Sequence, residues 1–216
     1  MKCNHCGLCC RDPLTQINVT VGDIWRIADF LNVEVEDLFK DKIGLNPFRE
    51  PEFKDVYDVD LGLNLPCKFR VNERCSIYPA RPLNCRLFPQ WVLARAPDEK
   101  IKEILKEHKC EYDLSNKEVY KKYVDEIGKI LFEEAEFYEL FKKVNVKGLF
   151  KDKGKGLREK EYNKVQKLRK MFKKQLDVKE IKKRINDNLD KIKENKKRLY
   201  EIEKDNQGEP HQEFSE

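Results

Sequence analysis

This sequence lacks the features that identify several common classes of protein. No apolar run approaches the length of a transmembrane helix, so we expect no membrane association. No glycine-rich loop follows a predicted strand in the pattern that binds nucleotides or S-adenosylmethionine. No Ser/His/Asp set or carboxylate pair stands out as a hydrolytic centre, so the catalytic residues of any enzyme activity stay unassigned.

Histidine is scarce, with 3 residues in the whole chain. His5 and His108 lie close to cysteines, where imidazoles are suitable zinc ligands. Because 8 cysteines are available as alternatives, we expect both histidines to face solvent. Any metal site is therefore predicted to depend on thiolates.

Cysteine, in contrast, is concentrated at the start of the chain. Four of the 8 cysteines form a C-x2-C-x2-C-C block within the first ten residues, and the others follow singly. A C-x2-C step lets two thiolates reach one metal, and this opening is like that of a bacterial ferredoxin motif. We predict an iron–sulfur cluster or zinc as the cofactor, with iron favoured. The candidate metal ligands are Cys3, Cys6, Cys9, Cys10, Cys67, Cys75, Cys85 and Cys110.

Two other interpretations of the cysteines fit the sequence less well. A disulfide framework is arithmetically possible with an even count, but it requires an oxidising compartment. The block begins at residue 3, which leaves no room for a signal peptide, so we expect a cytoplasmic protein. Inert buried thiols would explain Cys110 but not four cysteines in eight positions. Adjacent side chains diverge, so Cys9 and Cys10 are not expected to share one tetrahedral centre.

Two sequence blocks together resemble the CxxCxxCC family of zinc- or iron-chelating domains. The first is the N-terminal cysteine block, and the second is similar to the family pattern C-x-I-Y-x-x-R-P-x-x-C-R-x-F-P. The matching residues of the second block, after Cys67, are Cys75, Ile77, Tyr78, Arg81, Pro82, Cys85, Arg86, Phe88 and Pro89. The likeness covers about residues 1–115. It implies a metal site more firmly than an activity.

Three functional hypotheses follow. The first is a cytoplasmic binding or redox module that holds an iron–sulfur cluster or zinc. The second is a protein lysine N-methyltransferase-like enzyme, because flagellin lysine N-methylase carries a related cysteine domain; the C-x3-C-x2-C spacing of radical S-adenosylmethionine enzymes is absent. The third is a metal carrier in which Cys9 and Cys10 are a transient ligand pair.

Arginines near the cysteines have two possible roles. Arg11, Arg74, Arg81 and Arg86 lie within a few residues of candidate ligands, where they would compensate the negative charge of metallated thiolates. Alternatively, Arg81 caps a turn carbonyl and Arg86 makes a surface ion pair. The sequence leaves both interpretations open.

Secondary-structure patterns predict an α+β fold, a small cysteine-rich domain with short helices and hairpins followed by a long helical extension. Apolar alternation predicts strands near residues 17–21 and 55–61. Residues 67–75 read as a hairpin with its turn at residues 72–74 and with Cys67 and Cys75 at its open end. Thr20 and Asp23 have the spacing of a capping box, and Pro82 is expected near the start of a short helix within residues 81–88. Pro47 and Pro51 predict a break. The predicted units are 1–115 (metal-binding domain), 116–146 (helical segment, with helix expected through Val144), 147–156 (flexible joint), 157–204 (basic coiled-coil-like extension) and 205–216 (disordered tail).

The net charge of +5 conceals a basic C-terminal segment. Residues 151–204 hold 21 Lys and Arg against 10 Asp and Glu. This excess predicts either a solvated face or a protein or RNA partner. The helical seam there favours an αα-hairpin or docking onto a partner; it consists of Val178, Ile181, Ile185, Ile192, Leu199 and Ile202. The stretch 23–40 superficially resembles a helix-turn-helix, but it is acidic, so no specific DNA reading is expected.

Overall fold

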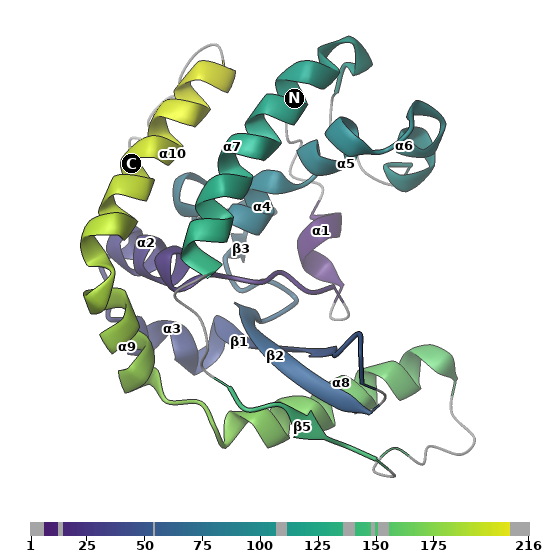
Figure 1. Ribbon diagram of the computed structural model, residues 1–216, viewed down its shortest axis with the longest axis vertical. Helices are drawn as coiled ribbons and strands as arrows, with labels where there is room; N and C mark the ends of the chain where they lie inside the picture. The colour runs from purple at the N-terminus through teal and green to yellow at the C-terminus, as the bar shows by residue number, and fades with distance from the viewer. Residues whose placement is uncertain are drawn as a thin grey trace.

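A small antiparallel sheet is surrounded by helices in the computed structural model (Figure 1), which confirms the predicted α+β class. The structure describes residues 7–12, 15–53, 55–106, 112–135, 141–147, 150 and 156–207. The first elements are α1 (Leu8–Arg11), α2 (Val21–Leu31), α3 (Val35–Asp41), β1 (Ile43–Arg49), β2 (Val56–Leu63), β3 (Arg70–Val71), β4 (Arg74–Cys75), η1 (Tyr78–Ala80) and α4 (Leu83–Leu87). The later ones are α5 (Gln90–Arg95), α6 (Asp98–Ile104), η2 (Leu114–Asn116), α7 (Lys117–Ala135), β5 (Val144–Asn145), α8 (Leu157–Lys173), α9 (Val178–Asp187) and α10 (Leu189–Gln207).

The sheet has the strand order β1-β2-β5. Along β1, Ile43 pairs with Leu63 and Pro47 pairs with Val59. The expected break at Pro47 was therefore wrong, because β1 is an edge strand and an edge position needs no amide donor on its outer side. Residues 17–19, predicted as a strand, lie beside the C-terminal end of β2. Backbone hydrogen bonds and a single bridge from Asn18 to Gly62 join them to it.

The helix expected through Val144 is shorter than the pattern indicated. Helix α7 ends at Ala135, and Val144 instead pairs with Tyr57 of β2. The β-branched Val144 and Val146 flank a polar residue, which suits a short strand. Whether Val144 belongs to a helix or a strand was therefore decided by its pairing with Tyr57, about ninety residues earlier in the chain.

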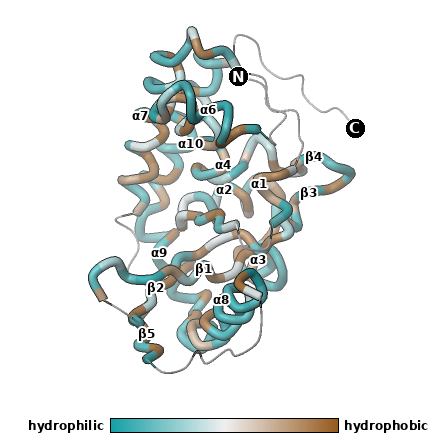
Figure 2. The backbone as a smooth tube through the Cα atoms, turned by 90° about the vertical axis from the view of Figure 1, so that its right-hand side faces the viewer, coloured by the Kyte–Doolittle hydropathy of each residue, from teal (hydrophilic) through white to brown (hydrophobic). Residues whose placement is uncertain are grey.

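The C-terminal helices share the core of the N-terminal half. Buried residues of α8, α9 and α10, including Phe172 and Ile185, belong to the same apolar cluster as Ile24 of α2 and Leu61 of β2. The predicted seam thus packs within the chain, on α2, α3 and α7, and α8 lies against β1 (Figure 2). The unit boundaries given above stay predictions, and most of the expected joint and the last nine tail residues lie outside the described residues.

No helix in the described part of the chain is both long enough and apolar enough to cross a membrane. The capping box predicted at Thr20 and Asp23 is present: each side chain accepts a hydrogen bond from the backbone amide of the other residue. It gives α2 a defined start.

Three polar side chains, from β1, β2 and the segment before α2, are joined by hydrogen bonds. Asn46 donates to Asn18 at 3.0 Å, and Asn18 donates to the carboxylate of Asp60. Burial, with a smaller contribution from the charge of Asp58, raises the pKa of Asp60 to about 6. Asp60 therefore holds its proton more tightly in the folded state than in the unfolded chain.

This raised pKa predicts a pH-dependent effect of Asp60→Asn. Asp60 contributes stability fully below its ordinary pKa of about 4, and this contribution disappears as the pH rises through about 6. Above pH 6 the variant should be more stable than the parent by about 1 kcal/mol, after discounting for solvent screening of a partly exposed side chain. Urea unfolding between pH 4 and 8 measures this; parallel pH profiles for both proteins would contradict it.

Candidate metal centre

The hairpin formed by β3 and β4 brings two predicted ligands together. Its turn consists of Asn72 and Glu73, with φ of 46° and 66°, as a tight two-residue turn requires. Cys75 pairs with Arg70, whose amide donates to the carbonyl of Cys67 at 3.2 Å. Cys67 and Cys75 therefore lie at the open end of the hairpin, as the sequence predicted.

The N-terminal block meets this hairpin through Cys10. The amide of Cys67 donates to the carbonyl of Cys10 at 2.9 Å, which connects α1 to the start of the hairpin. Gly7 precedes α1 with φ of 75°, and the Cys10 amide and thiol both bond to its carbonyl. A side chain at Gly7 would be strained by this φ and would also meet Arg70.

A fourth cysteine comes from α4. Burial raises the pKa of Cys85, and the nearby thiols of Cys67 and Cys75 raise it further. Burial likewise raises the pKa of Cys67 to about 11, with added repulsion from Cys10 and Cys75. Cys67, Cys75 and Cys85 thus lie near one another, Cys10 joins Cys67 through its backbone carbonyl, and all four pack against one apolar cluster.

Cys10 has the opposite electrostatic setting. A hydrogen bond with Cys9 lowers its pKa to about 7; burial opposes this, while Arg70 and Arg11 assist it. Both arginines also lie within 3.4 Å of the carboxylate of Glu73. Cys9 itself is exposed. The two adjacent cysteines therefore differ in exposure but stay in contact through this hydrogen bond, and Cys10 is the more buried of the two.

The remaining predicted ligands, Cys3, Cys6 and Cys110, lie outside the described residues, as do His5 and His108. The five described cysteines are thiols and not halves of a disulfide. Within the described ranges, no three His, Cys, Asp or Glu side chains form a ready ligand set.

Arg81 and Arg86, close to Cys85 in the sequence, are both buried. Arg81 does cap a turn, donating to the carbonyl of Tyr78 at 2.9 Å, and its guanidinium lies 4.0 Å from the ring centroid of that tyrosine. Arg86 is 3% exposed and donates to the carbonyls of Arg81 and Pro79. Both guanidinium groups form ion pairs with Glu203 of α10.

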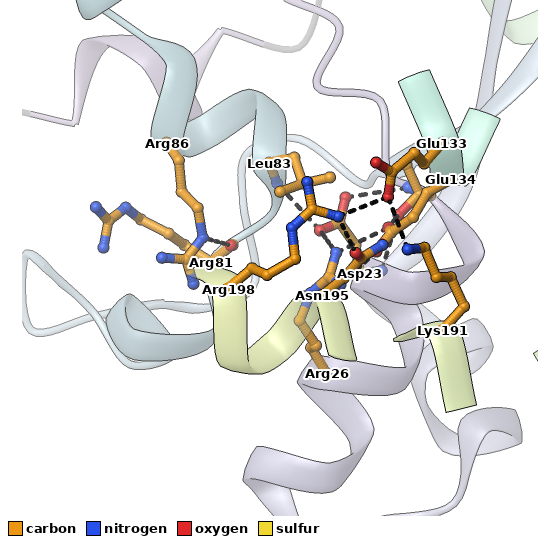
Figure 3. A network of polar contacts seen from close by, with 11 residues as sticks. Asp23, Arg26, Arg81, Leu83, Arg86, Glu133, Glu134, Lys191, Asn195 and Arg198 are labelled. Atoms are coloured by element: carbon orange, nitrogen blue, oxygen red, sulfur yellow. Dashed lines mark hydrogen bonds and ion pairs between the residues drawn. The ribbon is translucent and has the colours of Figure 1, made fainter. Parts of the chain in front are cut away.

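A network of buried charged side chains contacts the start of α4 (Figure 3). Asp23 accepts a hydrogen bond from the amide of Leu83 at 3.0 Å, at the start of the helix that carries Cys85. Arg26 joins Asp23 to Glu134 of α7 at 2.7 and 2.6 Å. Sequence analysis identified only Asp23, through its capping box. Glu134 and Glu203 carry no local signal, because their partners lie more than 100 residues away along the chain.

Comparisons with known proteins identify the family to which this chain belongs. A family described as "CxxCxxCC: Putative zinc- or iron-chelating domain" matches residues 2–123. The Uncharacterized protein MJ0661 of Methanocaldococcus jannaschii is 31% identical over 93 residues, 43% of this chain and 46% of that protein, so the match spans less than half of either. No solved structure matches. Because the family match covers more than half of its length, the chain belongs to the CxxCxxCC family of zinc- or iron-chelating domains.

Proposed function

We propose that this protein holds a thiolate-ligated metal centre between its N-terminal cysteine block and the segment from the hairpin to α4. The carrying observation is the convergence of Cys10, Cys67 and Cys75 with Cys85, from three separate segments of the chain. These four, with Cys3 and Cys6, would hold the metal. Such a set consists of sulfur alone, which suits zinc and iron–sulfur clusters.

Within this proposal we favour an iron–sulfur cluster over zinc. The chain has more thiolates than one tetrahedral zinc needs, and the opening C-x2-C-x2-C is ferredoxin-like. The positive charges of Arg11 and Arg70 lower the pKa of Cys10, and positive charge of this kind offsets a negatively charged thiolate centre. A bound cluster would supply one-electron transfer, whereas zinc would supply a structural cross-link.

Anaerobic purification followed by metal and sulfide analysis tests the identity of the metal. We expect iron, inorganic sulfide and broad visible absorption. A colourless protein with stoichiometric zinc and no sulfide would overturn the cluster but keep the thiolate centre. Absence of every transition metal from protein purified and refolded with iron or zinc would overturn both.

The two adjacent cysteines should differ in their importance for metal content. Cys10→Ser is expected to reduce bound metal at least tenfold, because Cys10 is the member that meets Cys67. Cys9→Ser is the matched control, and its exposed thiol should leave metal content within about twofold of the parent. Metal analysis after gel filtration measures both. Equal losses in the two variants would contradict the assignment.

A further inference from the structure

Among the three C-terminal helices, α8 carries the largest net positive charge. Helix α8 holds 7 Lys and Arg against 2 Glu, whereas α10 holds 6 against 5 acidic residues. Helix α9 lies between these, with 4 against 2. Helix α8 therefore carries the largest single share of the excess noted in the sequence, a net +5 of the +11 over residues 151–204, and it lies on the outer side of the sheet (Figures 1 and 2).

Five lysines form a stripe along α8 and its C-cap, here called the lysine stripe: Lys160, Lys164, Lys167, Lys170 and the C-cap residue Lys174. At 100° per residue they fall within an arc of about 120°, and they extend over about 21 Å of helix. Lys167, Lys170 and Lys174 are exposed, and the other two are half-buried. The opposite side of the helix carries the core residues Leu168 and Phe172.

The densest basic cluster of the sequence, residues 169–174, has some side chains directed inward and others exposed to solvent. Arg169 points inward, where its Nε donates to the carbonyl of Leu45 at 2.7 Å. Phe172 is fully buried and unable to stack on a base. Within residues 169–174, the exposed side chains are those of Lys170, Lys173 and Lys174, and none of them is aromatic.

The charges of the lysine stripe are not neutralised within the described residues. No carboxylate there forms an ion pair with any of the five ammonium groups. Lys164 instead lies 4.9 Å from the ring centroid of Tyr57, a contact that leaves its charge in place. Lysines of α9 and α10 differ: Lys182 pairs with Glu34 and Glu36, and Lys196 pairs with Asp29.

We propose that the lysine stripe binds duplex RNA through its phosphates. A length of about 21 Å corresponds to about six phosphates of one strand at the B-DNA spacing of about 3.4 Å, and to slightly more along the shorter rise of A-form RNA. Lysine provides point charges without the paired donors that read base edges, and double-stranded RNA is bound mainly through phosphate and ribose contacts. A single strand would require exposed aromatic platforms, but the exposed Tyr162 of α8 lies about 140° around the helix from the centre of the stripe, and Phe150, beside Lys164 and Lys167, is half-buried.

The test uses the full-length protein, because α8 shares the core and its deletion would disturb the fold. One variant replaces the five stripe lysines by glutamine. The matched control makes the same charge change on α9 and α10, at exposed positions: Lys179→Gln, Lys183→Gln, Lys193→Gln, Lys197→Gln and Lys204→Gln. If the first variant is unfolded by circular dichroism, the triple variant Lys167→Gln, Lys170→Gln, Lys174→Gln replaces it, with three control substitutions.

Fluorescence anisotropy with a 20-base-pair RNA duplex, from 50 to 300 mM salt, measures the binding. The stripe variant should bind at least tenfold more weakly at 50 mM salt and show a shallower salt dependence, whereas the control should stay within about twofold. Equal weakening of both variants would assign the effect to net charge and overturn the proposal. Competition by polyglutamate as strong as that by RNA of equal charge would also overturn it, in favour of an acidic protein partner.

Discussion

Replacing Arg26 by methionine is expected to lower the free energy of unfolding by about 3–5 kcal/mol. The guanidinium is 3% exposed and lies between Asp23 and Glu134, whose side chains are fully buried (Figure 3). Burial opposes its charge, but these two carboxylates prevail and raise the pKa of Arg26. Its removal would leave two buried carboxylates without a cation.

Arg198→Met is the matched control for this experiment. Arg198 lies in the same region and pairs with Glu133 at 2.8 Å, but both side chains are about one third exposed. Partly solvated pairs contribute little, so the control should lose less than about 1 kcal/mol. Urea unfolding at pH 7 gives both values. Similar losses in the two variants would show that burial of the ion pair does not determine how much stability is lost.

Removing the metal should have the second large effect, a fall of about 10 °C in the thermal midpoint. A metal that binds only the folded protein adds about 4 kcal/mol at a thousandfold excess over its Kd, and this converts to about 8–16 °C for a chain of this size. The ligands would close the loop from Cys10 to Cys85, so the binding energy becomes folding energy. This expectation rests on the proposed centre.

Scanning calorimetry of the metal-loaded protein, with and without excess chelator, measures the fall. Cys10→Ser serves as the control, since its midpoint should be low and should not respond to the chelator. Restoring the metal should restore the higher midpoint of the parent protein. A parent midpoint that is the same before and after verified metal removal would contradict the coupling of the centre to folding.

Features encoded by neighbouring residues were predicted correctly. The capping box of Thr20 and Asp23 is satisfied within one helical turn, and the Asn72–Glu73 turn places Cys67 and Cys75 together within nine residues. Pro82 precedes α4, as its fixed φ favours at a helix start. Each involves partners a few residues apart, so the sequence pattern already contains both sides of the interaction.

The sequence by itself thus determined the α+β class, the hairpin and the cysteine spacing that carries the family resemblance. Tertiary structure alone decided that β1 continues through Pro47, that Val144 joins β2, and that the C-terminal helices complete the same core. It also selected Glu134 and Glu203 as partners of buried arginines. These contacts join residues from about 10 to more than 100 positions apart, so a local sequence pattern carries no information about which residues meet. Burial then strengthens each contact once the chain has folded.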